Sequence, residues 1–63
     1  MKWEVAIYKK GLEINITNGE YTFFLGDAYS VHSKGEIVPD IMKQAKLMTH
    51  AQLFCDKLNE GEN

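Results

Sequence analysis

The sequence predicts an α+β fold, in which an antiparallel three- to four-stranded β-meander is followed by one C-terminal α-helix packed on the sheet. Apolar side chains recur with a period near two as far as Pro39 and with a period near 3.6 beyond it, which marks a change from strands to helix. The 63 residues, of which 44% are hydrophobic, are enough for one small core and too few for two. We therefore expect a single small domain over residues 1–63.

Three segments alternate apolar and polar residues as half-buried strands do, at about residues 2–9, 12–17 and 20–25. Asn18 and Gly19 lie between the second and third segments, and this dipeptide favours the positive φ angles of a two-residue type I′ hairpin. Such a turn places every apolar side chain of the two strands on one face, through the pairs Ile16 with Tyr21, Ile14 with Phe23 and Leu12 with Leu25.

The other connections are less strongly specified by the sequence. The first hairpin closes either through a two-residue turn at Lys10 and Gly11 or through a four-residue loop over residues 8–11, and the two registers differ by a slide of two residues. Tyr29 and Val31 alternate with polar neighbours, so residues 28–32 form either a short fourth strand or a loop. Pro39 suits the first position of a helix, which we expect to run over about residues 39–59.

The predicted helix carries more apolar surface than one sheet can cover. Its predicted sheet face holds Val38, Ile41, Met42, Ala45, Met48 and Cys55. A second apolar stripe holds Leu47, Ala51, Phe54 and Leu58. Either the same chain covers this stripe, by a curled sheet or a folded-back segment over residues 29–37, or a second copy packs against it across a two-fold axis. We favour the homodimer, because one sheet and one helix leave one side of each element without cover.

Two surfaces are candidates for binding a partner. The outer face of the sheet presents the aromatic rings of Tyr8 and Phe24, with Tyr29 beside them if the fourth strand forms. Large rigid rings serve as anchors for another protein, although they also pack within their own chain. The polar arc of the helix forms a basic ridge, which is either a second binding surface or a solvated helix face, and which consists of Lys43, Lys46, His50 and Lys57.

Charge disfavours nucleic acid, whose binding through the sheet face or the basic ridge is the alternative function. Some DNA-binding proteins do lay a β-sheet in a groove. A protein that neutralises several phosphates, however, gathers lysine and arginine on one surface, and arginine supplies the fork that reads guanine. This chain has a formal net charge of −2 and no arginine.

The sequence predicts no catalytic residues, no metal and no cofactor. His32, His50 and Cys55 are the only soft or borderline metal ligands, fewer than the four that a structural zinc site takes. His50 and Cys55 would lie about 140° apart around a helix, so they do not converge. The carboxylates Glu4, Glu13 and Glu20 are explained by cross-strand pairing on the outer face.

The sequence also favours a cytoplasmic protein without a membrane partner. Its longest apolar run, residues 5–8, is far shorter than the ~20 residues that span a bilayer, and no signal-peptide pattern is present. One cysteine cannot form an intramolecular disulfide, and no motif indicates a family. The favoured function is a small non-catalytic protein–protein interaction module: a dimeric regulator or inhibitor that docks on a partner macromolecule and occludes it. Its size and composition suit a regulator of a phage or a mobile element.

Overall fold

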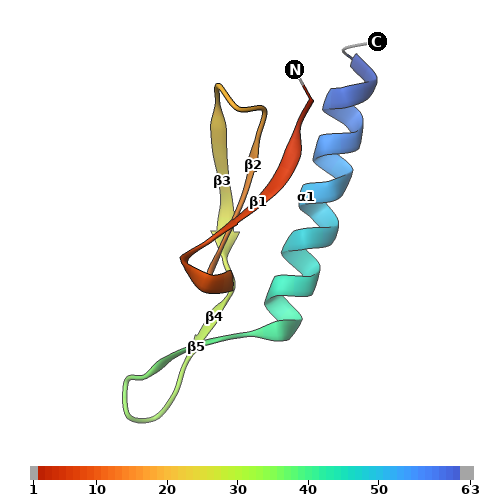
Figure 1. The fold of residues 1–63 in the computed structure, drawn as a ribbon. Helices are drawn as coiled ribbons and strands as arrows, with labels where there is room; N and C mark the ends of the chain where they lie inside the picture. Colours follow the sequence, from red (N-terminus) through yellow and green to blue (C-terminus); the bar gives the residue numbers. More distant parts are fainter. Residues whose placement is uncertain (1, 62–63) are drawn as a thin grey trace.

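A computed structural model, which describes residues 2–61, confirms the α+β class and has two layers. The three-stranded antiparallel sheet has the order β1-β2-β3 and is formed by β1 (Glu4–Tyr8), β2 (Glu13–Thr17) and β3 (Thr22–Asp27). A separate antiparallel hairpin follows, formed by β4 (Tyr29–Val31) and β5 (Ile37–Pro39), and the helix α1 (Ile41–Gly61) comes last. Figure 1 shows α1 lying along the sheet, with the β4–β5 hairpin projecting past the N-terminal end of the helix.

The molecule is thin and elongated for its mass. Its principal extents are 49 × 20 × 12 Å, and its radius of gyration is 13.2 Å, against about 10.6 Å for a compact domain of this length. The accessible surface is 4750 Å², whereas a compact monomer of 7.2 kDa exposes roughly 4,100 Å². The fold therefore leaves more surface open than a closed domain of this size.

Small side chains of α1 make the contact between the two layers. Ile14 and Ile16 of β2 form the buried core with Ala28, Ala51 and Cys55. Of the predicted sheet face of the helix, only Cys55 is buried against the sheet. The rest of that face is wrong: Ile41 is 77% and Met42 72% exposed, and Val38 lies in β5. The stripe that packs is rotated from it, because alanine and cysteine let the helix approach the sheet closely; it runs through Gln44, Leu47, Ala51, Cys55 and Asn59.

The β2–β3 hairpin closes differently from the predicted type I′ turn. Gly19, with a φ of +93°, and Glu20 occupy its two central positions, a placement that suits the glycine of a type II′ turn. Asn18 does not adopt a positive φ; its Oδ1 accepts hydrogen bonds from the N–H groups of Glu20 and Tyr21, at 2.9 and 2.8 Å. The predicted register therefore slides by two residues, so that Thr17 pairs with Thr22 and Ile16 with Phe23, and a bulge follows at Leu25, which leaves Ile14 opposite Gly26.

The β1–β2 connection keeps the register of the predicted two-residue turn but uses a longer loop. Ile7 pairs with Ile14 and Tyr8 with Glu13, so that residues 9–12 form the connection. It contains a 3₁₀-type turn, η1 (Lys9–Gly11), in which Lys9 and Lys10 have φ angles of 54° and 56°. This left-handed region costs an L-residue with a side chain roughly 1–2 kcal/mol, so the loop is strained at two consecutive lysines.

Asp40 joins the hairpin to the helix. Pro39 belongs to β5, and α1 begins two residues later than predicted, with Asp40 as its N-cap: Asp40 Oδ1 accepts a hydrogen bond from the N–H of Lys43 at 3.1 Å. The other carboxylate oxygen accepts one from Ser30 Oγ at 2.5 Å, and the Asp40 N–H donates to the carbonyl of Ala28 at 3.0 Å. The hydrogen bond from Ser30 is the main reason why the pKa of Asp40 lies below its usual value.

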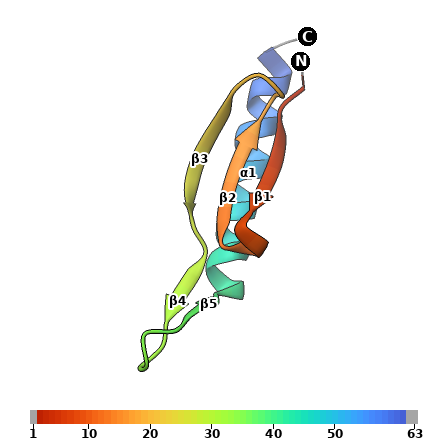
Figure 2. The ribbon, with the colours of Figure 1, turned by 60° about the vertical axis from the view of Figure 1, so that its left-hand side comes forward.

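An amide clamp fixes the other end of the helix to β1. The Trp3 N–H donates to Asn59 Oδ1 at 2.8 Å, and Asn59 Nδ2 donates to the Trp3 carbonyl at 3.1 Å. The Trp3 ring stacks on Phe23 of β3, with centroids 5.6 Å apart. Of the three strands of the sheet, β3 lies farthest from α1 in Figures 1 and 2.

Candidate partner-binding surface

The sheet face turned away from α1 carries the two aromatic residues expected there. Asn15 of β2 lies between Ala6 of β1 and Phe24 of β3, and alternation places Tyr8 on the same face. Tyr8 is 44% and Phe24 56% exposed. Both rings thus offer apolar area on a face that no other element of residues 2–61 covers as α1 covers the opposite face.

Asn15 is the polar group that this face encloses, and its importance was not recognised in the sequence. Its side chain is buried, yet Asn15 Nδ2 makes no hydrogen bond. A buried unpaired donor costs about 1–3 kcal/mol, so this amide lowers the stability of the sheet. The central strand position between two flanking strands is the sequence signal that predicts burial for an asparagine here.

Tyr29 does not join Tyr8 and Phe24. It pairs with Pro39 in the β4–β5 hairpin, so the predicted fourth strand exists but is not part of the three-stranded sheet. Its carbonyl accepts a hydrogen bond from Lys43 Nζ at 3.1 Å, and its side chain is half-buried. The pairing strand β5 was not predicted, because Pro39 was assigned to the helix.

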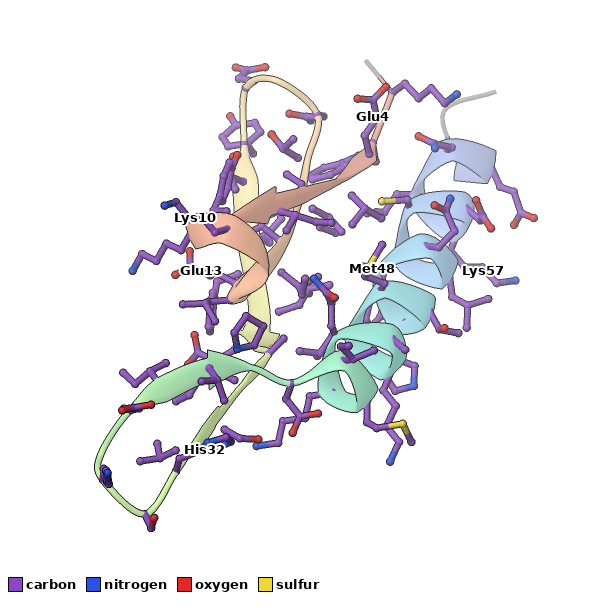
Figure 3. The ribbon with its side chains drawn as sticks, turned by 60° about the horizontal axis from the view of Figure 1, so that its bottom comes forward. Glu4, Lys10, Glu13, His32, Met48 and Lys57 are labelled. Carbon is purple, nitrogen blue, oxygen red and sulfur yellow. The ribbon has the colours of Figure 1, made fainter. Side chains whose placement is uncertain are left out.

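The residues of the basic ridge lie on α1 but do not all present free charges. Lys43 is engaged by Tyr29, and Lys57 lies 3.8 Å from Glu60 in an exposed ion pair. Lys46 and His50 are exposed between them. Figure 3 shows the Lys57 side chain directed away from the sheet. His32 lies on the β4–β5 hairpin, far from Lys57.

The predicted dimer stripe is divided by the structure into a buried half and an exposed half. Ala51 is fully buried in the core, and Leu47 packs against that core beside Gly26. These two residues contact the sheet of their own chain, which corrects the expectation that they are free for a second copy. Phe54 and Leu58 lie further along the same stripe and are 53% and 40% exposed.

The described residues do not gather groups for metal or nucleophilic chemistry. No cluster of three or more potential ligands occurs in residues 2–61. Cys55 is buried, and desolvation is the main cause that raises the pKa of its thiol, which keeps the sulfur in the unreactive protonated form. Within the same range, no helix is both long enough and apolar enough to cross a membrane.

Comparison of this chain with known protein families, with curated proteins and with solved structures found no match.

Proposed function

We propose that this protein is a non-catalytic protein–protein interaction module that acts as a homodimer and occludes a partner protein in the cytoplasm. The observation that carries the proposal is the outer sheet face, where half-exposed Tyr8 and Phe24 flank the unpaired amide of buried Asn15. Aromatic anchors around a desolvated polar group are typical of the central part of a protein interface.

The arrangement favours a protein over other ligands. Apolar side chains of a partner protein can pack on the half-exposed rings of Tyr8 and Phe24, which offer large rigid apolar area. Glu13 lies on this face, held by Lys9 at 3.2 Å, and Glu4 shares the face by alternation. The negative charges of these carboxylates repel the phosphates of a nucleic acid, which further disfavours nucleic-acid binding at the sheet.

The mechanism is steric. A flat face on a sheet covers partner surface without needing a pocket, so bound protein blocks whatever else uses that surface. The phage or mobile-element context remains a prediction from size and composition.

Photo-crosslinking in cells tests the proposal. A benzophenone side chain placed at Tyr8, on β1, is expected to capture one specific protein other than this chain, and the same group at Met42, which is exposed on the helix, is not. Purified partner is then expected to lose at least tenfold in affinity for Tyr8→Ala and Phe24→Ala, while Lys46→Glu binds like the parent. Equal binding by all three variants would refute the outer face, and loss only in Lys46→Glu would transfer the function to the basic ridge.

A nucleic-acid ligand gives a different result in the same series. Binding to oligonucleotides that falls steeply with salt and disappears in Lys46→Glu would overturn the protein-interaction proposal.

A further inference from the structure

We propose that two copies of this chain join through the free edge of β3, giving one continuous six-stranded antiparallel sheet with both helices on the same side. This inference rests on the proposed function in one respect, since it specifies the interface of the proposed homodimer. It concerns the purified chain alone, so its test is independent of any partner.

The first argument is the open backbone of β3. The strand lies at the edge of the sheet, and no described strand pairs with its outer side. Hydrogen-bonded pairs alternate along an antiparallel ladder, and Asn18 donates to the carbonyl of Tyr21. The N–H and C=O groups of Thr22 and Phe24 therefore point away from β2, ready to pair with another strand.

The second argument is that nothing in β3 opposes such pairing. Residues 21–26 read Tyr-Thr-Phe-Phe-Leu-Gly and contain no charge and no proline, although 25% of the whole chain is charged. Edge strands that must stay single are usually protected by lysine, proline or a bulge. Here the bulge at Leu25 protects only the end near Gly26, and the stretch before it stays regular. At the other edge Glu4 places a charge in β1 itself, and Asn59 occupies the backbone of Trp3 next to that strand.

The third argument concerns the side chains that pairing would bring together. Phe23 faces the helix side, since it pairs with buried Ile16, yet it is 54% exposed. Figures 1 and 2 show α1 nearer to β1 and β2 than to β3. Leu47 contacts β3 through Gly26, so Phe54 and Leu58 of the same stripe line the side of α1 nearest β3. A second sheet continuing from β3 would cover Phe23 and close the space beside Phe54.

Symmetry makes the occupant a second copy. Antiparallel pairing of β3 with its own copy requires a two-fold axis perpendicular to the sheet, which keeps both helices on one side and makes the interface self-complementary. Five large, roughly half-exposed side chains lie along or beside this edge. They supply roughly 500 Å² per protomer, and the strand backbone adds to this, approaching the roughly 800 Å² that a stable interface takes. The residues are Tyr21, Phe23, Phe24, Phe54 and Leu58.

Sedimentation of the purified chain at micromolar concentration is the test. We expect a dimer that Thr22→Lys and Thr22→Pro convert to monomer, because the first puts like charges at the joint and the second removes an outward N–H. The matched control is Glu4→Lys, since Glu4, Thr17 and Thr22 share one row across the sheet and Glu4 lies on the opposite edge. It is expected to stay dimeric, and circular dichroism verifies that each variant folds.

Single cysteines then locate the two-fold axis. Pairs across it lie on the same face, so one of Thr22→Cys, Phe23→Cys or Phe24→Cys is expected to cross-link with its own copy in high yield under mild oxidation. Buried Cys55 does not compete, and Tyr8→Cys on β1 is the negative control. A monomeric parent, or a dimer that Thr22→Lys and Thr22→Pro leave intact, overturns the proposal. Capture of a different chain by β3 in place of a second copy does so too. None of these results depends on partner binding at Tyr8.

Discussion

Gly26 of β3 lies against Leu47 of α1, and adding one carbon there tests the packing of the two layers. A Cβ at position 26 would lie 3.1 Å from Leu47 Cδ2 and 3.3 Å from Leu47 Cδ1. Both distances are shorter than the optimal carbon separation of about 3.5–4.0 Å. Because both methyl groups are engaged, turning the Leu47 isopropyl group brings one methyl into the place of the other.

The magnitude follows from two opposing effects. Replacing glycine by alanine in an unstrained position stabilises by about 0.4–1 kcal/mol through the unfolded chain, whereas overpacking costs about 1–3 kcal/mol. We expect Gly26→Ala to lower the free energy of unfolding by about 1 kcal/mol. In a Leu47→Ala background the crowding is absent, and the same change is expected to stabilise by about 0.5 kcal/mol. The coupling between the two sites is then about 1.5 kcal/mol.

Urea unfolding followed by Trp3 fluorescence measures this cycle. All four proteins are compared at one protomer concentration, because dimerisation would make the midpoint depend on it. Gly61→Ala is the control, since no atom lies within 4 Å of a Cβ at that position. A stabilising Gly26→Ala in the parent, or additive effects of the two substitutions, would refute the close approach.

Three further perturbations test the loop strain, the clamp and the helix cap. Lys10→Gly is expected to stabilise the folded protein by about 0.5–1 kcal/mol, because glycine adopts the φ of 56° without strain. The control Lys34→Gly, at a residue without positive φ, is expected to destabilise it. Chemical denaturation compares the two variants with the parent. Asn59→Ala removes both hydrogen bonds to Trp3 and is expected to lower the free energy of unfolding by about 2 kcal/mol. Hydrogen exchange at the Trp3 amide is expected to become faster, and unchanged exchange would contradict the clamp. The lowered pKa of Asp40 stabilises the folded state above the ordinary value near 3.9, and this is lost as the pH falls towards the native value. The melting temperature of Asp40→Asn is therefore expected to lie below that of the parent at pH 7 and to approach it as the pH falls below the ordinary pKa of aspartate.

Side-chain periodicity was sufficient to predict the main elements, since alternation and the helical repeat are properties of the chain itself. The three strands and the helix lie close to the predicted ranges, because the alternation around Ile14 and Ile16 survives in the folded state. The β1–β2 pairing has the register predicted for a two-residue turn, which was one of the two alternatives. The outer-face position of Phe24 followed from alternation as well.

Features that depend on competition between local groups were not predictable in the same way. Asn18 was expected to adopt a left-handed backbone, but its side chain caps the turn in its place. The distribution of large apolar residues predicts that the helix turns the face around Ile41 towards the sheet. Close packing of the two layers instead favours the small residues Ala51 and Cys55 and leaves Ile41 exposed. Asp40 does carry a sequence signal, because aspartate is a strong N-cap, and weighing it above Pro39 would have placed the helix start correctly.

The clamp between Trp3 and Asn59 has a consequence for synthesis of the protein on the ribosome. Its two residues are 56 positions apart, so β1 leaves the ribosomal exit tunnel well before Asn59 does. Until Asn59 emerges, the backbone N–H and C=O groups of Trp3 lack their native partner. Pausing during translation of α1 would prolong this interval, and a nascent chain in that state is the form most exposed to premature association with its neighbours on the same messenger RNA.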